Sequence, residues 1–338
     1  MRELAIVSGK GGTGKTSIVA SFAALAGNAV LADCDVDAAD LYLVTDPQIE
    51  HRETFHCGRE AVIRAPDCTS CGLCQSRCRF DAVRRDEDGT FTIDPTACEG
   101  CGVCVWSCPA KAIDFPERIS GQWFVSSTRY GPMVHARLNP GAENSGKLVF
   151  RVREEARHLA DHTGRGLILI DGPPGIGCPA ISSISGASLV LAIAEPTPSG
   201  KHDLGRVLDL AAHFGLPAAV VVNKFDLNVG LSEGIESDAR KRGAAAVGRI
   251  AYRHAFTAAQ RRGASVVEVE SGRAAEEVRK TWQSVQQLLE TASPQHRQGR
   301  VALRGVLQDA PHRHDEAERP EVEEPPGKSA ATTTEEGA

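Results

Sequence analysis

The feature that most constrains this chain is a glycine-rich stretch near its beginning. Residues 9–16 match the pattern G-x-x-x-x-G-K-[ST] throughout, and they are Gly9, Lys10, Gly11, Gly12, Thr13, Gly14, Lys15 and Thr16. The stretch lies between a short apolar run and a segment with helical periodicity, which is the context this pattern requires. Glycines let backbone N–H groups surround phosphate oxygens, and the start of a helix adds partial positive charge. We expect Lys15 to reach the β- and γ-phosphates of a nucleotide and Thr16 to bind Mg²⁺.

The apolar runs along the chain predict the fold class. These runs are short and apolar on both faces, and they cover residues 4–7, 29–32, 167–170, 189–194 and 218–222. They alternate with segments of helical spacing, as is typical of a buried parallel sheet. The sequence therefore predicts an α/β fold, a P-loop NTPase whose mostly parallel sheet is flanked by helices. Most of the runs end in polar residues, where such sheets bind ligands.

Eight of the eleven cysteines lie in residues 58–117, which we call the cysteine-rich segment. They form two runs of the pattern C-x-x-C-x-x-C-x-x-x-C, typical of bacterial ferredoxins, in which the fourth cysteine of each run ligates the other cluster. We expect one 4Fe-4S cluster on Cys68, Cys71, Cys74 and Cys108, and a second on Cys98, Cys101, Cys104 and Cys78. A zinc site and disulfides are the alternatives.

Two local features bear on this prediction. Asp88-Gly89, between the two runs, is a hairpin signal flanked by short strand-like segments, as expected for a small α+β ferredoxin domain. Arg79 follows Cys78 where ferredoxins often have proline, which affects the turn and the potential of that cluster.

Composition predicts the domain organisation and excludes some functions. We expect an ATPase domain formed by residues 1–57 and 118–292, an inserted ferredoxin domain at 58–117, and a disordered acidic tail at 293–338. The net charge of −6 argues against binding nucleic acid through a basic surface. Residues 172–194 form the longest uncharged stretch, but prolines and glycine interrupt it, so no membrane span is expected. We expect a cytoplasmic protein whose clustered cysteines bind metal.

The phosphate loop also carries a family resemblance. With Lys10 it reads K-G-G-T-G-K-T, which resembles the deviant Walker A motif of MinD-type ATPases, the superfamily that includes MinD, ParA, Mrp-type iron–sulfur carriers and the nitrogenase iron protein. The resemblance implies a homodimer in which Lys10 reaches the partner's nucleotide. It also implies that Asp35 orients the attacking water, that Asp33 and Asp171 lie at Mg²⁺, and that Asn223 reads adenine.

The order of the motifs resembles a MinD-type family in which a two-cluster ferredoxin is inserted after switch I, the segment that by this resemblance begins at residues 33–37. The resemblance extends over residues 1–292 and includes residues 131–134 and 144–149, where the ATPase core resumes. Cys178 follows Asp171 by seven residues, the offset of a cluster-bridging cysteine in the nitrogenase iron protein, so it is a bridging or client-facing residue or a structural one. Cys34 and Cys57 are expected to be a buried small residue and a linker residue.

These features together predict an ATP-hydrolysing iron–sulfur protein with Mg²⁺ and two 4Fe-4S clusters. A nucleotide-driven dimer switch would be coupled to electron transfer to a redox client protein. The alternative is ATP-dependent assembly or delivery of an iron–sulfur or other metal cofactor to a client. A MinD/ParA-like positioning ATPase is disfavoured, because it needs a basic amphipathic C-terminal helix and residues 309–338 carry nine acids and three bases. The intact nucleotide motifs also disfavour a plain ferredoxin with a vestigial nucleotide site.

Overall fold

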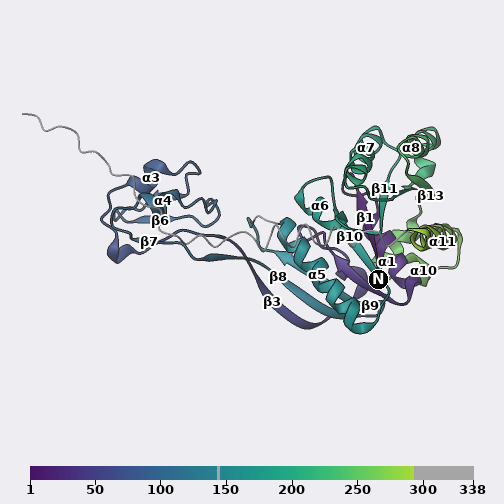
Figure 1. Cartoon of the computed structure of the whole chain (residues 1–338), viewed down its shortest axis with the longest axis horizontal. Helices are drawn as coiled ribbons and strands as arrows, with labels where there is room; N and C mark the ends of the chain where they lie inside the picture. Colours follow the sequence, from purple (N-terminus) through teal and green to yellow (C-terminus); the bar gives the residue numbers. More distant parts are fainter. Residues whose placement is uncertain (143–144, 293–338) are drawn as a thin grey trace, which may run out of the picture. The chain divides into compact units, whose positions relative to one another are not determined.

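The structure is a computed structural model that describes residues 1–142 and 145–292 (Figure 1). The predicted acidic tail lies outside the described residues. The predicted α/β architecture is confirmed by a nine-stranded sheet of order β13-β12-β11-β1-β10-β2-β9-β8-β3. Its strands are β1 (Arg2–Ser8), β2 (Ala29–Asp33), β3 (Gln48–Arg59), β8 (Glu117–Thr128), β9 (Gly131–Leu138), β10 (Leu167–Pro174), β11 (Leu189–Ala194), β12 (Ala218–Asn223) and β13 (Ala245–Ile250).

Strand direction divides this sheet into two parts. From β13 to β9 all neighbouring strands are parallel, whereas β8 is antiparallel to both β9 and β3. The five apolar runs form β1, β2, β10, β11 and β12, the buried centre of the sheet. Their carboxyl ends therefore meet at one edge, where α/β sheets bind ligands.

Helices cover both faces of the sheet, and alternate residues of β1 point to opposite sides. Ala5 and Val7 pack in a core with residues of α5–α8, while Leu4 and Ile6 pack in a second core with residues of α1 and α9–α11. The helices are α1 (Lys15–Ala26), α2 (Tyr42–Thr45), α5 (Ser145–Thr163), α6 (Cys178–Ile184), α7 (Pro198–His213), α8 (Val229–Lys241), α9 (His254–Arg261), α10 (Val266–Val269) and α11 (Arg273–Thr291). Among the described helices, none combines the length and apolar character needed to cross a membrane.

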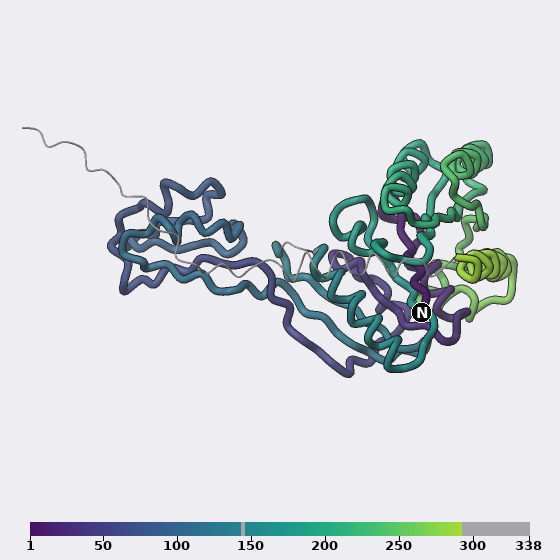
Figure 2. Tube along the Cα trace, viewed as in Figure 1, coloured from purple at the N-terminus to yellow at the C-terminus, as the bar shows by residue number. Residues whose placement is uncertain are grey.

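The cysteine-rich segment leaves and rejoins the sheet through a two-stranded ribbon. Its strands, β3 and β8, pair from Gln48↔Ser127 to Arg59↔Glu117 (Figure 2). The segment contains α3 (Leu73–Arg77), α4 (Val103–Ser107), the pair β4 (Val62–Ile63) and β7 (Ile113–Asp114), and the pair β5 (Val83–Arg85) and β6 (Phe91–Ile93). The predicted hairpin is present between β5 and β6, with Gly89 at φ 87°. The segment also has a hydrophobic core of its own, which includes Val83, Phe91 and Ile113.

Candidate functional site

A cavity of about 480 Å³ lies at the carboxyl edge of the sheet, large enough for a nucleotide. The lining residues come from the phosphate loop, switch I, the end of β12 and α9, and they are Ser8, Gly11, Gly12, Thr13, Gly14, Lys15, Thr16, Ser17, Asp35, Ala38, Asp40, Pro174, Asn223, Lys224, Ala251, Tyr252, Arg253, Phe256, Thr257 and Gln260. Thus most predicted nucleotide-binding residues line one cavity. Gly9, Lys10, Asp33 and Asp171 do not line it.

Asn223 ties the end of β12 to the phosphate loop. Its Nδ2 donates a hydrogen bond to the Thr13 carbonyl at 2.6 Å, and its Oδ1 accepts one from the Lys224 backbone N–H at 3.0 Å. Gly14 has φ 86°, and a Cβ there would lie 2.4 Å from Asn223 Nδ2, so both backbone and space require glycine. In this structure the Asn223 amide therefore holds the phosphate loop. Thr13 Oγ1, buried in the described structure without a hydrogen-bond partner, remains available to a ligand.

Three aspartates surround the Lys15 ammonium. Asp33, the last residue of β2, is the register partner of Asp171 within β10, and both are buried. Lys15 forms an ion pair with Asp171, and its Nζ lies 3.5 Å from Asp35 Oδ2. Burial alone would lower the pKa of Lys15, but the carboxylates of Asp171 and Asp35 outweigh it and keep that pKa above its ordinary value. Burial, reinforced by Asp171, raises the pKa of Asp33 well above its usual range. In this structure the aspartates thus pair with the Lys15 ammonium, the group that the phosphates of a nucleotide would attract.

Lys10 makes contacts within its own chain. Its Nζ lies 2.5 Å from Glu195 Oε1 and 3.2 Å from the hydroxyl oxygens of both Thr197 and Ser199. Glu195 Oε2 also lies 3.0 Å from Lys224 Nζ, which donates a hydrogen bond to the Gly12 carbonyl at 2.8 Å. Burial would raise the pKa of Glu195, but Lys10 and Lys224 lower it below its ordinary value. An ionic network therefore joins Lys10 and Gly12 of the phosphate loop to the residues that follow β11 and β12.

Sequence reasoning missed a group of residues at the α9 side of the cavity. Tyr252, Arg253, Phe256 and Gln260 line it, from the turn after β13 and from α9. Their aromatic rings, guanidinium and amide are suited to contacting a nucleotide base or sugar. The preceding strand, β13, contains Gly248 and Arg249 and is only partly buried, so it lacks the apolar run that marked the other strands.

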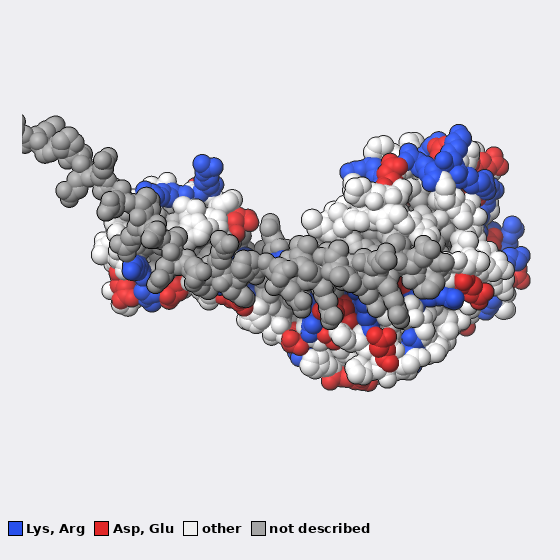
Figure 3. All heavy atoms as spheres, in the orientation of Figure 1, with Lys and Arg blue, Asp and Glu red and all other residues white. Residues whose placement is uncertain are grey.

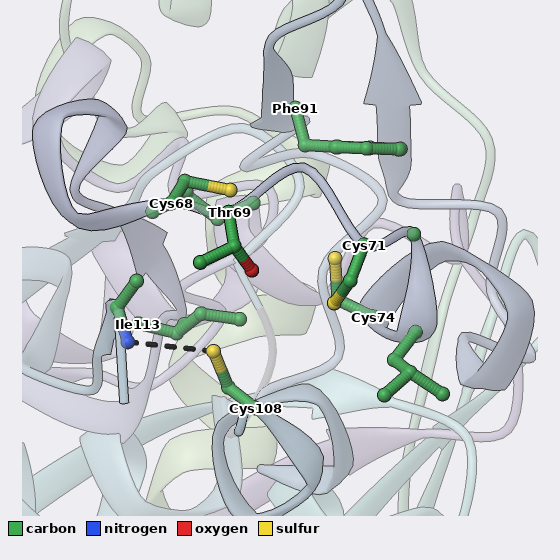
Figure 4. A pocket seen from close by; sticks show the side chains of 11 residues that line it. Cys68, Thr69, Cys71, Cys74, Phe91, Cys108 and Ile113 are labelled. Atoms are coloured by element: carbon green, nitrogen blue, oxygen red, sulfur yellow. Dashed lines mark hydrogen bonds between the residues drawn. The ribbon is translucent and has the colours of Figure 1, made fainter. Parts of the chain in front are cut away.

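The two groups of four cysteines predicted in the cysteine-rich segment each line a separate cavity. The first cavity is lined by Cys68, Cys71, Cys74 and Cys108, together with apolar residues that include Phe91 and Ile113 (Figure 4). The second is lined by Cys78, Cys98, Cys101 and Cys104, together with Phe80 and Val103. Each cavity thus takes three cysteines from one run and the fourth from the other, since α3 and α4 pack side by side.

Thiolate sulfurs are ligands for soft metals, and hydrogen-bond donors lie near two of these sulfurs. Backbone N–H groups of Ser70 and Ala112 lie 3.4 Å from the sulfurs of Cys68 and Cys108, as N–H···S hydrogen bonds. None of the eleven cysteines is in a disulfide in this structure. Within residues 1–142 and 145–292, no three His, Cys, Asp or Glu side chains are grouped to hold a metal ion.

The remaining three cysteines have different environments. Cys34 is fully buried after β2, as expected for a small apolar residue, and burial raises its thiol pKa. Cys57, predicted to be a linker residue, is buried near the end of β3, the strand that leads into the cysteine-rich segment. Cys178 is exposed at the first position of α6, on the segment that follows Asp171.

Fold and cavity together define a P-loop nucleotide hydrolase. Residues 4–266 match the model of the CobQ/CobB/MinD/ParA nucleotide-binding domain. The chain belongs to this family of P-loop ATPases.

Individual relatives agree with that assignment. An uncharacterized protein of Methanocaldococcus jannaschii is 36% identical over 235 residues, which cover 67% of this chain and 79% of the relative. The fold is similar to that of the septum site-determining protein MinD complexed with Mg-ADP from Pyrococcus horikoshii, with a TM-score of 0.51 and 18% identity, covering 86% of this chain and 98% of that one. A short stretch of 46 residues is 41% identical to the pyruvate synthase subunit PorD of M. jannaschii and covers 14% of this chain and 54% of PorD.

Proposed function

We propose that this ATPase couples nucleotide binding and hydrolysis to electron transfer through two 4Fe-4S clusters held by the cysteine-rich segment. One observation carries the proposal: eight cysteines divide between two cavities, four to each, in the crossed combination typical of two-cluster ferredoxins. The short similarity to PorD, a subunit of pyruvate synthase, agrees with it.

The residues present fit such clusters in number and chemistry. Each cavity has four thiols and otherwise mostly apolar walls, and N–H groups reach two of the sulfurs of the first set. Cys68, Cys71, Cys74 and Cys108 would hold one cluster, and Cys78, Cys98, Cys101 and Cys104 the other. When bound, each cluster would supply one-electron redox chemistry. The protein would provide the thiolates, exclude water and donate the N–H···S hydrogen bonds.

At the nucleotide site, the ion pairs of Lys15 would make the conformation depend on whether a nucleotide is bound. We infer that the phosphates of ATP draw Lys15 away from Asp171 and Asp35, which frees both carboxylates. Asp171 and Asp33, with the Thr16 hydroxyl, would then lie at Mg²⁺, and Asp35 would be free to orient the attacking water. Members of this family commonly form dimers, and Lys10 would leave Glu195 to reach the partner's nucleotide in an ATP-dependent homodimer.

A second function is favoured by a specific observation. Cys178 is exposed at the start of α6, seven residues after Asp171, and its thiol is accessible to a partner. ATP-dependent assembly or delivery of an iron–sulfur or other metal cofactor to a client protein would use an exposed thiol at this place. Enclosed, fully ligated clusters are less suited to delivery than to electron transfer, so we rank this function second.

ATP turnover by anaerobically purified protein distinguishes these functions. We expect the rate to differ between the oxidised protein and the same protein reduced with dithionite, because electron coupling links the redox state to the nucleotide switch. The variant Lys15→Ala gives the background rate in both states. Equal rates in the oxidised and reduced protein would contradict electron coupling.

The crossed arrangement of the cysteines gives a second prediction. Cys78→Ser is expected to damage mainly the cluster that shares its cavity, the one on Cys98, Cys101 and Cys104, and to spare the other. Iron analysis should fall from about eight to about four irons per chain, with one electron paramagnetic resonance signal lost. Cys108→Ser is the matched variant and should remove the other signal. If both variants removed the same signal, the crossed assignment would be wrong.

A further inference from the structure

An aromatic side chain lies almost fully in solvent beside the second cysteine cavity. Trp106 on α4 is 79% exposed, although tryptophan is usually buried. Val103 lies three residues earlier on α4, so both side chains lie on the same side of that helix. Val103 and Phe80 line the second cavity and are themselves exposed at 38% and 45%. We call Phe80, Val103 and Trp106 the apolar patch.

Two arginines adjoin this patch without ion-pair partners. Arg77 ends α3 and Arg79 follows Cys78, and both are exposed. Among the described residues neither forms an ion pair, whereas Arg64 and Arg84 of the same segment pair with aspartates. Figure 3 shows Lys and Arg side chains over the part of this segment that carries α3. In the sequence these two arginines therefore flank Cys78, a cysteine of the second cavity.

Acidic groups also lie near the same cavity and offset the positive charge of the two arginines. Asp81 follows Phe80 and is exposed, and Glu99 lines the cavity. Arginine side chains are longer than aspartate or glutamate side chains, so their charges extend farther from the surface. Arg77 and Arg79 are equal in number to these two acids, but among the described residues neither arginine is held in an ion pair, so both remain available to an acidic partner.

We propose that the apolar patch, with Arg77 and Arg79, is the docking surface for an acidic one-electron carrier protein. The inference rests on the proposed function, because the second cavity must hold a redox centre. The carrier loses one electron and the centre in the second cavity gains one, with no covalent bond made or broken. Exposed aromatic and arginine side chains are the residue types that dominate binding energy at protein interfaces. Opposite charge raises the rate of encounter.

Trp106 and the arginines have separate parts in this docking. The indole would bury its large apolar surface against the carrier and hold it beside the cavity. It lies next to Gly102, which lines that cavity, because a Cβ on Gly102 would be 3.4 Å from the indole ring. Arg77 and Arg79 would act at longer range and orient an acidic surface toward Cys78. The first cavity lacks a comparable feature among the described residues: Leu73 is its exposed large apolar neighbour, and Arg85 lies over the Phe91 ring. Electrons from an acidic carrier would therefore enter at the second cavity.

Stopped-flow reduction of the full chain by an acidic flavodoxin, in its fully reduced form, tests this surface. The second-order rate should fall by about 10-fold or more in Arg77→Glu/Arg79→Glu, because steering charges change such rates by about 10 to 1,000-fold. Trp106→Ala should raise the flavodoxin concentration that gives the half-maximal rate, because the indole would contribute binding energy to the docked complex. Asp81→Asn should raise the rate, and asparagine tolerates the backbone of Asp81 at φ 51°. The wild-type rate should fall as salt increases.

The control variant is Lys147→Glu/Lys280→Glu, which makes the same change in net charge on exposed sites of α5 and α11. We expect it to match the wild type. Reduction by dithionite, which needs no docking, should be the same in all variants. If charge reversal prevents cluster incorporation, Arg77→Gln/Arg79→Gln and Trp106→Ala provide the same test.

Three results would overturn the docking surface. They are a wild-type rate in Arg77→Glu/Arg79→Glu, an equal loss in the control pair, and an equal loss with dithionite, since the last would mean a damaged centre. If the wild-type protein holds no clusters that dithionite can reduce, that result would instead contradict the proposed function itself.

Discussion

Lys15→Ala is expected to lose nucleotide binding, with ATP and ADP affinity falling by at least about 100-fold. The ammonium is the central positive charge of the cavity, and its removal would leave three neighbouring carboxylates facing the phosphates. Calorimetric titration with Mg-ADP and Mg-ATP measures the effect. Lys280→Ala, on an exposed site of α11, is the matched control and should bind as the wild type does.

Lys10→Ala should give a different result from Lys15→Ala. Lys10 does not line the cavity, and its contacts are with Glu195, Thr197 and Ser199, so ADP affinity of the monomer should stay near the wild-type value. ATP-dependent dimerisation and hydrolysis should be lost, if the lysine acts on the partner's nucleotide. An equal loss of ADP affinity in both variants would show that Lys10 acts within its own chain.

Glu3→Ala should destabilise the protein by about 3–5 kcal/mol, the usual cost of removing one partner of a buried ion pair. Glu3 on β1 accepts hydrogen bonds from Arg153 and Arg157, which lie one turn apart on α5. Arg153 is buried and also donates to the Ser182 and Ser185 carbonyls of α6. Without Glu3, the positive charge of Arg153 would remain buried with no carboxylate to pair with. Urea unfolding followed by circular dichroism measures the change.

Two controls separate this charge effect from simple truncation. Glu276→Ala changes an exposed glutamate on α11 and should leave the free energy of unfolding nearly unchanged. Glu3→Leu/Arg153→Met removes both charges and should recover much of the loss, because an apolar pair replaces a buried ion pair with little cost. A double variant as unstable as Glu3→Ala would contradict the ion-pair explanation.

The same glutamate makes a pH-dependent contribution. Burial would raise its pKa, but Arg153 and Arg157 lower it below the ordinary value of 4.5. The unfolded chain therefore binds this proton at a higher pH than the folded chain does. The stabilisation is complete above pH 4.5 and is lost as the pH falls through the folded pKa.

Much of the fold could be predicted because its central strands are apolar on both faces. The runs of β1, β2, β10, β11 and β12 stand out for that reason, and the α/β prediction is confirmed. The antiparallel strands β3 and β8 were not predicted, since charged and polar residues occupy most of the exposed β3. Their pairing depends on contacts between segments far apart in the sequence.

The candidate site was predictable where a short motif carries its own geometry. The phosphate loop and the first three cysteines of each run are of this kind, because spacing alone brings their members together, whereas the fourth cysteine of each cavity arrives through the packing of α3 against α4. The Lys10–Glu195–Lys224 network was not predicted, since its residues follow different strands and meet only through the order of the sheet. The roles of the site residues in catalysis and in cluster binding stay predictions.

The ribbon of β3 and β8 has a consequence for how this architecture can change over evolution. Its strands stay paired up to Arg59 and Glu117, and β4 and β7 continue the pairing a few residues farther on. Entry and exit of the cysteine-rich segment are therefore neighbours, as at the tip of a hairpin. A two-residue turn at that tip would close the chain without breaking a bond of the sheet. Modules whose ends lie one strand spacing apart could be exchanged there, so that ATPases with and without the segment would differ by a single recombination event.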